Sequence, residues 1–299
     1  MGADMWSVRE ALEKFIQSLE LTQGQQDEVS RQHTMVRESL RQRLKTKTDF
    51  LAGSYSRNTA IRPLHDIDLF VVLGEVSLGS STSISSGGGL TPDAGLKQVR
   101  QALQAEWRET EPVLQQHSVH LGFSKSGIGF DVVPAFEVTG RDAYLIPERQ
   151  TGKWILTNPR IHQKLSTQAN ELAGKKLKPL LKAVKHWNRH HASSPLGSFH
   201  LEVMSYSAFS SAPKDYLEGL EKLFSHLSQQ VLSPCPDPAR LGPNVDEQMV
   251  TTQRGTAQQI LASAARQVRL AREESASDLA QAHGRLRGLF GEFYRQRGP

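Results

Sequence analysis

Two aspartates inside an uninterrupted apolar run constrain this chain most. The run of residues 66–73, Asp-Ile-Asp-Leu-Phe-Val-Val-Leu, is typical of a buried strand, because branched and aromatic residues fill it without a break. Side chains alternate between the two faces of a strand, so Asp66 and Asp68 point the same way. Two like charges on one buried face repel each other unless a cation compensates them. The pattern therefore predicts a divalent metal site, and oxygen ligands without a nearby cysteine favour Mg²⁺ or Mn²⁺.

A second apolar run, at residues 127–134, carries one central acid, Asp131. If this strand pairs beside the first, Asp131 joins the same cluster. Two ions about 4 Å apart, held by shared carboxylates, can clamp the attacking and leaving oxygens of a phosphoryl displacement. We therefore expect Asp66, Asp68 and Asp131 to bind two ions and to be the catalytic residues.

A glycine-serine turn, Gly53-Ser54, precedes the first strand. Glycine lets the backbone approach a phosphate closely, and the Ser54 hydroxyl and the N–H groups of the turn can bind phosphate oxygens. Two aspartates separated by one residue are common on solvated edges and turns. Their place inside an apolar strand, after this turn and before Asp131, favours the functional interpretation.

The composition narrows the class of protein. A chain of 299 residues allows one large or two ordinary domains. No apolar run reaches the ~18 residues that a membrane span needs, and the N-terminus lacks a signal-peptide pattern. A single cysteine, Cys235, excludes internal disulfides and cysteine-based metal sites, so we expect a cytoplasmic address and no membrane partner. The net charge of +5 favours anionic partners without separating nucleic acids from nucleoside triphosphates.

The first half of the chain predicts a small mixed sheet backed by helices. Helices are expected from a capping box at Ser7 and Glu10, over 25–44 and over 96–116, and further strands at 119–123 and 130–138. The serine- and glycine-rich stretch between Gly74 and Gly95 is expected to be a flexible, dispensable insertion.

After Trp154 the strand signal fades, and the pattern predicts helices only. They are expected at 159–172, 175–191, 198–210, 213–232 and 249–297, the last broken near Gly284. The predicted fold is thus α+β, with a catalytic lobe in residues 1–155 and a helical lobe in residues 156–299. Ligand sites are common in clefts between such lobes, so we place the active site there.

Four cationic residues share one face of the predicted helix at 175–191, because they recur at steps of four, three and four: Lys178, Lys182, Lys185 and Arg189. Such a stripe is usually solvated, but beside a triphosphate site one of its lysines is expected to reach the phosphates. Ser198 can be an N-cap or a phosphate ligand at a helix start. Phe199 can be a core residue or can stack on a nucleobase.

The pattern Gly53-Ser54, Asp66-x-Asp68 and Asp131 resembles the polymerase-β-like nucleotidyltransferases. A longer pattern resembles a narrower group, the cGAS/DncV-like nucleotidyltransferases of bacteria (CD-NTases), which are relatives of oligoadenylate synthetase. It comprises Gly-Ser-Tyr-x-Arg-x-Thr-x-Ile at 53–61, Lys-His-Trp-Asn at 185–188, Ser-Phe-His-Leu-Glu at 198–202 and Asp-Pro at 237–238. The similarity extends over about residues 50–245.

This resemblance implies an enzyme that joins NTPs, with ATP expected among them, into a cyclic or short linear oligonucleotide second messenger and releases pyrophosphate. It implies a role in anti-phage operons (CBASS), an operon-encoded regulatory protein as partner and no requirement for nucleic acid. Gly53 and Ser54 would hold the triphosphate, and Lys185 and Ser198 would contact phosphates. Phe199 stands where relatives place a base-stacking tyrosine. The alternatives are a template-independent RNA or tRNA nucleotidyltransferase, a drug-modifying nucleotidyltransferase and a non-catalytic nucleotide-binding protein.

Overall fold

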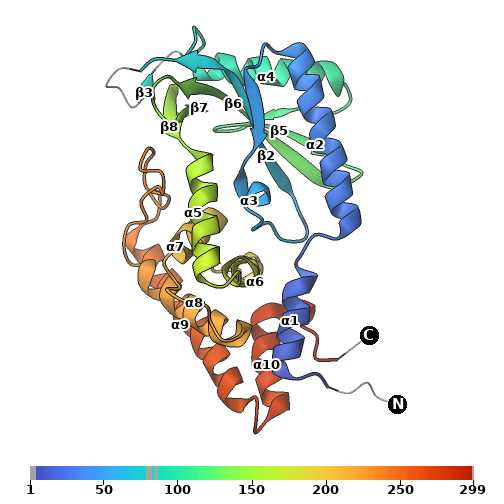
Figure 1. The fold of residues 1–299 in the computed structure, drawn as a ribbon, viewed down its shortest axis with the longest axis vertical. Coiled ribbons are helices and arrows are strands. Elements are labelled where there is room, and N and C mark those ends of the chain that lie inside the picture. Colours follow the sequence, from blue (N-terminus) through green and yellow to red (C-terminus); the bar gives the residue numbers. More distant parts are fainter. Residues whose placement is uncertain (1–4, 79–82, 85–86, 298–299) are drawn as a thin grey trace.

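The structure is a computed structural model that describes residues 5–78, 83–84 and 87–297 (Figure 1). It confirms the predicted α+β fold. A mixed sheet and the helices beside it form the upper part in Figure 1, and a group of helices forms the lower part. Helix α5, Pro159–Leu172, leads from the sheet into this group.

The sheet has strand order β1-β2-β6-β7-β8-β3, with β5 also pairing with β6 and β4 pairing with β5. The bounds of the strands are β1 Thr48–Leu51, β2 Asp66–Val76, β3 Ser83–Ile84, β4 Val113–Leu114, β5 Val119–Phe123, β6 Ile128–Val138, β7 Tyr144–Glu148 and β8 Lys153–Thr157. The central strands β2 and β6 run parallel, and the other neighbours are antiparallel. The predicted pairing of the two aspartate-bearing strands is therefore confirmed.

Two helices, α2 (Gln23–Arg43) and α4 (Pro92–Glu106), pack on the sheet. Val36 of α2 and Leu103 of α4 lie in one buried cluster with Ile67 of β2 and Phe130 of β6. Ile67 alternates with the aspartates along β2. The burial of its side chain on the helix-covered face therefore turns both carboxylates to the opposite face.

The lower part is built from α6 (Leu177–His190), α7 (Ser198–Ser205), α8 (Tyr216–Gln230), α9 (Thr251–Glu274), α10 (Leu279–Phe290) and the short 3₁₀ helix Gly291–Phe293. The first helix, α1 (Val8–Ser18), packs into the same core. Phe15 of α1 contacts Phe290 at a ring-centroid distance of 4.6 Å, and Trp6 N donates a hydrogen bond to Gln296 O (3.0 Å). Within the described ranges, no helix is long and apolar enough to cross a bilayer.

Several sequence predictions of element bounds are wrong. The helix expected at 96–116 is α4, which begins earlier because Thr91 caps it and Pro92 occupies its first turn. Strands β7 and β8 were not predicted, and β8 continues past Trp154. The last helical stretch breaks between α9 and α10, at 275–278, and Gly284 lies inside α10. Of the capping box expected at Ser7 and Glu10, the described residues show one half: the Ser7 hydroxyl accepts a hydrogen bond from Glu10 N.

The stretch between Gly74 and Gly95 is not simply an insertion. Strand β2 runs on to Val76, β3 pairs with β8, and Gly87 pairs with Leu90. Trp154 Nε1 donates a hydrogen bond of 2.9 Å to Leu90 O, which fixes the end of the stretch to the sheet. Residues 79–82 and 85–86 lie outside the described part of the chain, so the predicted flexibility is not addressed there.

Candidate active site

The register of three neighbouring strands brings the catalytic candidates together. Asp68 of β2 lies opposite Asp131 of β6, and Asp131 lies opposite His120 of β5. Asp66, two residues before Asp68, adds a second carboxylate on the same face of β2. The side chains of Asp66, His120 and Asp131 each offer a ligand atom within 4.8 Å of the others.

His120 is the residue of this cluster that the sequence did not reveal. A hydrogen bond of 2.9 Å joins its Nδ1 to Asp131 Oδ1, and the same nitrogen lies 3.7 Å from Asp66 Oδ1. Its strand, Val-His-Leu-Gly-Phe, has an ordinary alternation in which a single polar residue carries no signal. Only the pairing of β5 with β6 places the imidazole beside the carboxylates.

The electrostatics of the cluster favour a cation. Burial, together with the charge of Asp131, raises the pKa of Asp68 to about 6, although Arg57 attracts the carboxylate. Burial also raises the pKa of Asp131, against the hydrogen bond from His120. Asp66 is 51% exposed and keeps the cluster open to solvent. The donors present therefore fit a divalent ion, which would compensate the repulsion between the carboxylates.

The predicted glycine-serine turn is the short helix α3, Gly53–Ser56, which lies directly against Asp68. A Cβ atom at Gly53 would lie 1.6 Å from Asp68 Oδ2, and the φ of Gly53 is +63°. Both the close approach and the left-handed backbone require glycine here. The turn is closed by Ser54 O, which accepts hydrogen bonds from Thr59 N (2.9 Å) and Ala60 N (3.1 Å).

A pocket of about 320 Å³ joins this turn to the helical part of the chain. Asp68 lies at its sheet end. All five residues that the sequence proposed for nucleotide binding line it: Gly53, Ser54, Lys185, Ser198 and Phe199. The structure thus gathers residues separated by up to 146 positions (199 − 53) around one cavity. Asp66 and Asp131 lie beside Asp68 at the edge of the sheet.

A buried ion network forms part of the wall of this pocket. Glu202, which is 0% exposed, accepts hydrogen bonds from Arg57 Nε (2.6 Å), Lys185 Nζ (2.9 Å) and Thr59 Oγ1 (2.9 Å). Burial by itself would raise the pKa of Glu202, but the charges of Lys185 and Arg57 outweigh it and lower the pKa to about 2. The network ties α6 and α7 to the turn that contacts Asp68.

The cationic face of α6 is therefore not solvated as a whole. Lys182 is buried, and its Nζ donates hydrogen bonds to Glu20 and to Asn58 Oδ1 (3.3 Å). Arg189 donates to Pro63 O (3.1 Å). Together with Lys185, these residues attach α6 to the segment between the turn and Asp66.

The side chains around Phe199 form the other wall of the pocket. The guanidinium of Arg57 lies 5.0 Å from the centre of the Phe199 ring, and the His162 ring lies 5.2 Å from it. His162 is held by Asp237 (2.8 Å), which also accepts from the backbone N–H groups of Leu241 and Gly242. The Asp237-Pro238 motif therefore supports the pocket from behind. Gly197, not Ser198, is the N-cap of α7, so the hydroxyl of Ser198 is not used as a cap.

Comparison with known proteins identifies the family. The model of the Second Messenger Oligonucleotide or Dinucleotide Synthetase (SMODS) domain matches residues 6–170. Over 193 residues, which are 61% of this chain and 50% of the relative, the chain is 31% identical to a cyclic AMP-AMP-AMP synthase of Acinetobacter sp. (strain ATCC 27244 / 9458). It is 26% identical to a probable cyclic nucleotide synthase of Bacillus cereus (strain VD146) over 62% of this chain and 63% of that protein.

Solved structures share the fold over nearly the whole chain. The dinucleotide cyclase DncV of Vibrio cholerae, in complex with GTP and 5MTHFGLU2, superposes with a TM-score of 0.78 at 13% identity, covering 97% of both chains. CdnC of E. coli MS115-1 with ATP superposes with a TM-score of 0.75 at 18% identity, covering 96% of this chain and 98% of CdnC.

The fold is that of the polymerase-β-like nucleotidyltransferases. The chain belongs to the SMODS family and is a CD-NTase, as the sequence resemblance indicated. The match spans about half the length of the Acinetobacter relative and somewhat under two thirds of the length of the Bacillus relative.

Proposed function

We propose that this protein is a second-messenger synthase that joins NTPs into a cyclic or short linear oligonucleotide and releases pyrophosphate. The observation that supports this most strongly is the convergence of Asp66, Asp68 and Asp131 beside a pocket lined by Gly53 and Ser54. The family model and the names of the two relatives favour an oligonucleotide product. A place in anti-phage CBASS signalling is part of the same proposal.

Asp66 and Asp131, with His120, would hold Mg²⁺ or Mn²⁺. Asp68, which lies opposite Asp131, would be a further ligand, and we propose two ions. Such ions neutralise the charge that develops on the attacking and leaving oxygens when one nucleotide joins another. Asp131 would lie nearest the attacking hydroxyl. The hydrogen bond from His120 restrains the orientation of its carboxylate.

The pocket residues would hold the nucleotide that receives the attack. Gly53 and Ser54 would bind the triphosphate, while the Phe199 ring stacks on the base. Ser198 would be a further phosphate contact because its hydroxyl is free of the capping role. Lys185 already binds Glu202 and Thr59, so a phosphate would compete with these partners for its ammonium group.

We further propose a division near residue 155, with a catalytic unit in 1–155 and a helical unit in 156–299 that completes the nucleotide pocket. The pocket lining, drawn from both ranges, supports this division, although α1 packs with the helices of the second range. The E. coli relative CdnC has been solved as a complex with HORMA. This supports a regulatory protein as a partner of this chain.

The product assay tests the proposal directly. We expect the protein, incubated with all four NTPs and Mg²⁺ or Mn²⁺, to release pyrophosphate and to form oligonucleotides of about two to four residues. Cyclic products resist phosphatase because no terminal phosphate remains. The assay includes the neighbouring gene products as activators. Extension of an RNA primer by many nucleotides, with nothing made from NTPs alone under any of these conditions, would assign the protein to the tailing polymerases instead.

A second prediction concerns the metal preference that His120 confers. Imidazole suits Mn²⁺ better than Mg²⁺, which prefers oxygen ligands. We therefore expect His120→Asn to weaken Mn²⁺ binding by about tenfold or more and to change Mg²⁺ binding little. Free Mn²⁺ is measured by electron paramagnetic resonance in the absence of nucleotide. The matched control is His117→Asn, because His117 bonds to Pro147 O (2.7 Å) and offers no ligand to the described cluster. Equal Mn²⁺ affinity in the wild type and His120→Asn would show that only oxygen ligands bind.

A further inference from the structure

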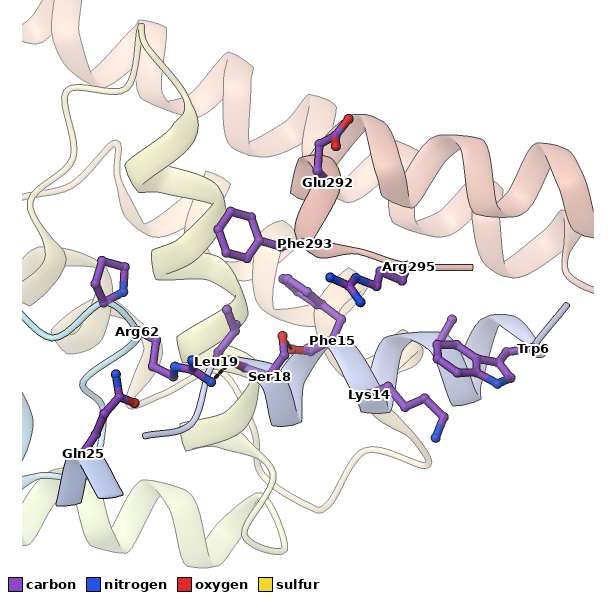
Figure 2. Close-up of a pocket in the computed structure, with 12 residues that line it drawn as sticks. Trp6, Lys14, Phe15, Ser18, Leu19, Gln25, Arg62, Glu292, Phe293 and Arg295 are labelled. Atoms are coloured by element: carbon purple, nitrogen blue, oxygen red, sulfur yellow. Dashed lines mark hydrogen bonds between the residues drawn. The ribbon is translucent and has the colours of Figure 1, made fainter. Parts of the chain in front are cut away.

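A second cavity, of about 670 Å³, lies between α1 and the last described residues (Figure 2). Three aromatic and three cationic side chains line it: Trp6, Phe15, Phe293, Lys14, Arg62 and Arg295. Its volume lies within the range of about 300–1,000 Å³ that is typical of small-molecule sites. None of these residues belongs to the nucleotide pocket.

The cations of this cavity are not paired with acids of the described residues. In the described ranges of the chain, none of its three cations forms an ion pair: Lys14 lies over the Trp6 ring (4.7 Å), and the Arg62 guanidinium donates to Ser18 O (3.5 Å). The single acid in the lining, Glu292, is 92% exposed and pairs with Arg287 at 3.6 Å. The cavity is therefore locally positive and complementary to an anion.

The aromatic lining adds a preference for a flat ligand. Phe15 is buried, whereas Phe293 is 51% exposed, so part of an aromatic ring at this cavity is accessible to a ligand. A ring system placed between such faces gains stacking energy, while an arginine binds its anionic group. We propose that this cavity binds a small molecule with an aromatic ring system and a negative charge.

The cavity is connected to the active site through two shared elements. The first is the segment before Asp66: Arg62 N donates to Leu19 O (3.2 Å) at the end of α1, and Asp66 follows four residues later. The second is α6. His186 packs against Phe15 and Phe293, at ring-centroid distances of 5.4 and 4.7 Å, while the adjacent Lys185 binds Thr59 and Glu202.

A ligand in this cavity would therefore stabilise one position of the segment that carries Asp66. The proposal that the cavity binds a ligand does not depend on the proposed function. An effect of that ligand on oligonucleotide synthesis rests on the proposed function. The expected effect is positive, because a restrained Asp66 is held in place for metal binding before substrate arrives.

The test uses 1-anilinonaphthalene-8-sulfonate, an aromatic anion whose fluorescence rises in apolar sites. We expect saturable binding to the wild type and at least about tenfold weaker binding in Arg295→Ala, which removes a charge-assisted contact, and in Phe293→Ala, which removes a ring contact. Arg266→Ala and Val113→Ala, which remove an exposed cation and an exposed apolar side chain elsewhere, are the matched controls. Equal affinity in all five proteins, or no saturable binding to the wild type, would overturn the proposal.

Hydrogen exchange supplies a second readout that needs no catalysis. With the probe bound, the backbone N–H groups of residues 59–66 should exchange more slowly in the wild type, and Arg295→Ala should not show this change at the same probe concentration. Binding without any change at 59–66 would remove the connection to the active site. Failure of the product assay would leave both results untouched, so the two proposals fail separately.

Discussion

Replacement of Asp68 by asparagine is expected to lower the rate of oligonucleotide synthesis by about a thousandfold or more while making the metal-free protein more stable. Asp68 would hold the metal ions, so its loss removes the charge that binds them. The same carboxylate is desolvated beside Asp131 and has a pKa of about 6, so its ionised form destabilises the fold when no cation is present. Activity and stability should therefore change in opposite directions, which a residue needed only for folding would not show.

The raised pKa of Asp68 predicts how the stability of the protein changes with pH. Between pH 3.8 and about 6, folded Asp68 binds a proton that the unfolded chain has released. The free energy of unfolding that Asp68 contributes therefore falls as the pH rises through this window. The asparagine side chain of the variant does not titrate. In EDTA, the melting temperature of Asp68→Asn should exceed that of the wild type more at pH 7.5 than at pH 4.5.

The control for this substitution is Glu75→Gln, which removes an acid from the same strand. Glu75 is exposed and pairs with Lys47, so both activity and melting temperature should stay close to those of the wild type. An Asp68→Asn protein with wild-type synthesis would contradict the metal assignment. A lower melting temperature in EDTA at pH 7.5 would contradict the proposed repulsion between the carboxylates.

Replacement of Glu202 by alanine is expected to destabilise the protein by about 3–5 kcal/mol, because Arg57 and Lys185 would be left as unpaired buried cations. In a chain of this size, such a loss lowers the melting temperature by roughly 6–10 °C. Thermal and urea unfolding measure the effect. The rate of oligonucleotide synthesis should fall as well, because Glu202 holds α6 and α7 against the turn that contacts Asp68.

The folded pKa of Glu202, about 2, lies below its unfolded value of 4.5. Its contribution to stability is therefore complete above about pH 4.5 and is lost as the pH falls toward 2. Glu218→Gln is the matched control, because Glu218 pairs with Lys222 at the surface and should contribute under about 1 kcal/mol. If Glu202→Ala destabilised no more than this control, the buried network would not hold the turn.

A double substitution separates the network from simple packing. Lys185→Met with Glu202→Gln removes one buried cation together with the negative charge, so it should be less destabilised than the sum of the two single variants. Additive losses would show that Lys185 and Glu202 do not interact energetically.

The acids of the site could be predicted from the chain because their signal is local. The alternation of β2 places Asp66 and Asp68 on one face, and the apolar surroundings of Asp131 predict a second buried strand. The class of protein was indicated by a resemblance that these residues carry together with the Gly53-Ser54 turn and the motifs at 185–188, 198–202 and 237–238. Such patterns span a few residues, over which backbone geometry alone relates one side chain to the next.

What the sequence did not show depends on partners that are distant along the chain. The step pattern of α6 predicted a common face for Lys182 and Lys185, but not that Glu202 would neutralise Lys185. Strand β7 has no clear pattern because Pro147 follows only three residues that favour a strand, and its pairing with β6 and β8 supplies the stability that its own sequence lacks.

The chain by itself thus predicted the cluster of acids and the glycine-serine turn beside it, because covalent neighbours and strand alternation are enough to place them, and its motifs indicated the family. Tertiary structure alone decided the addition of His120 to the acids, the burial of the α6 lysines and the existence of the second cavity. Each of these depends on strand register or helix packing between residues far apart in sequence. The free energy of that packing is distributed over the whole core, so no single segment encodes it.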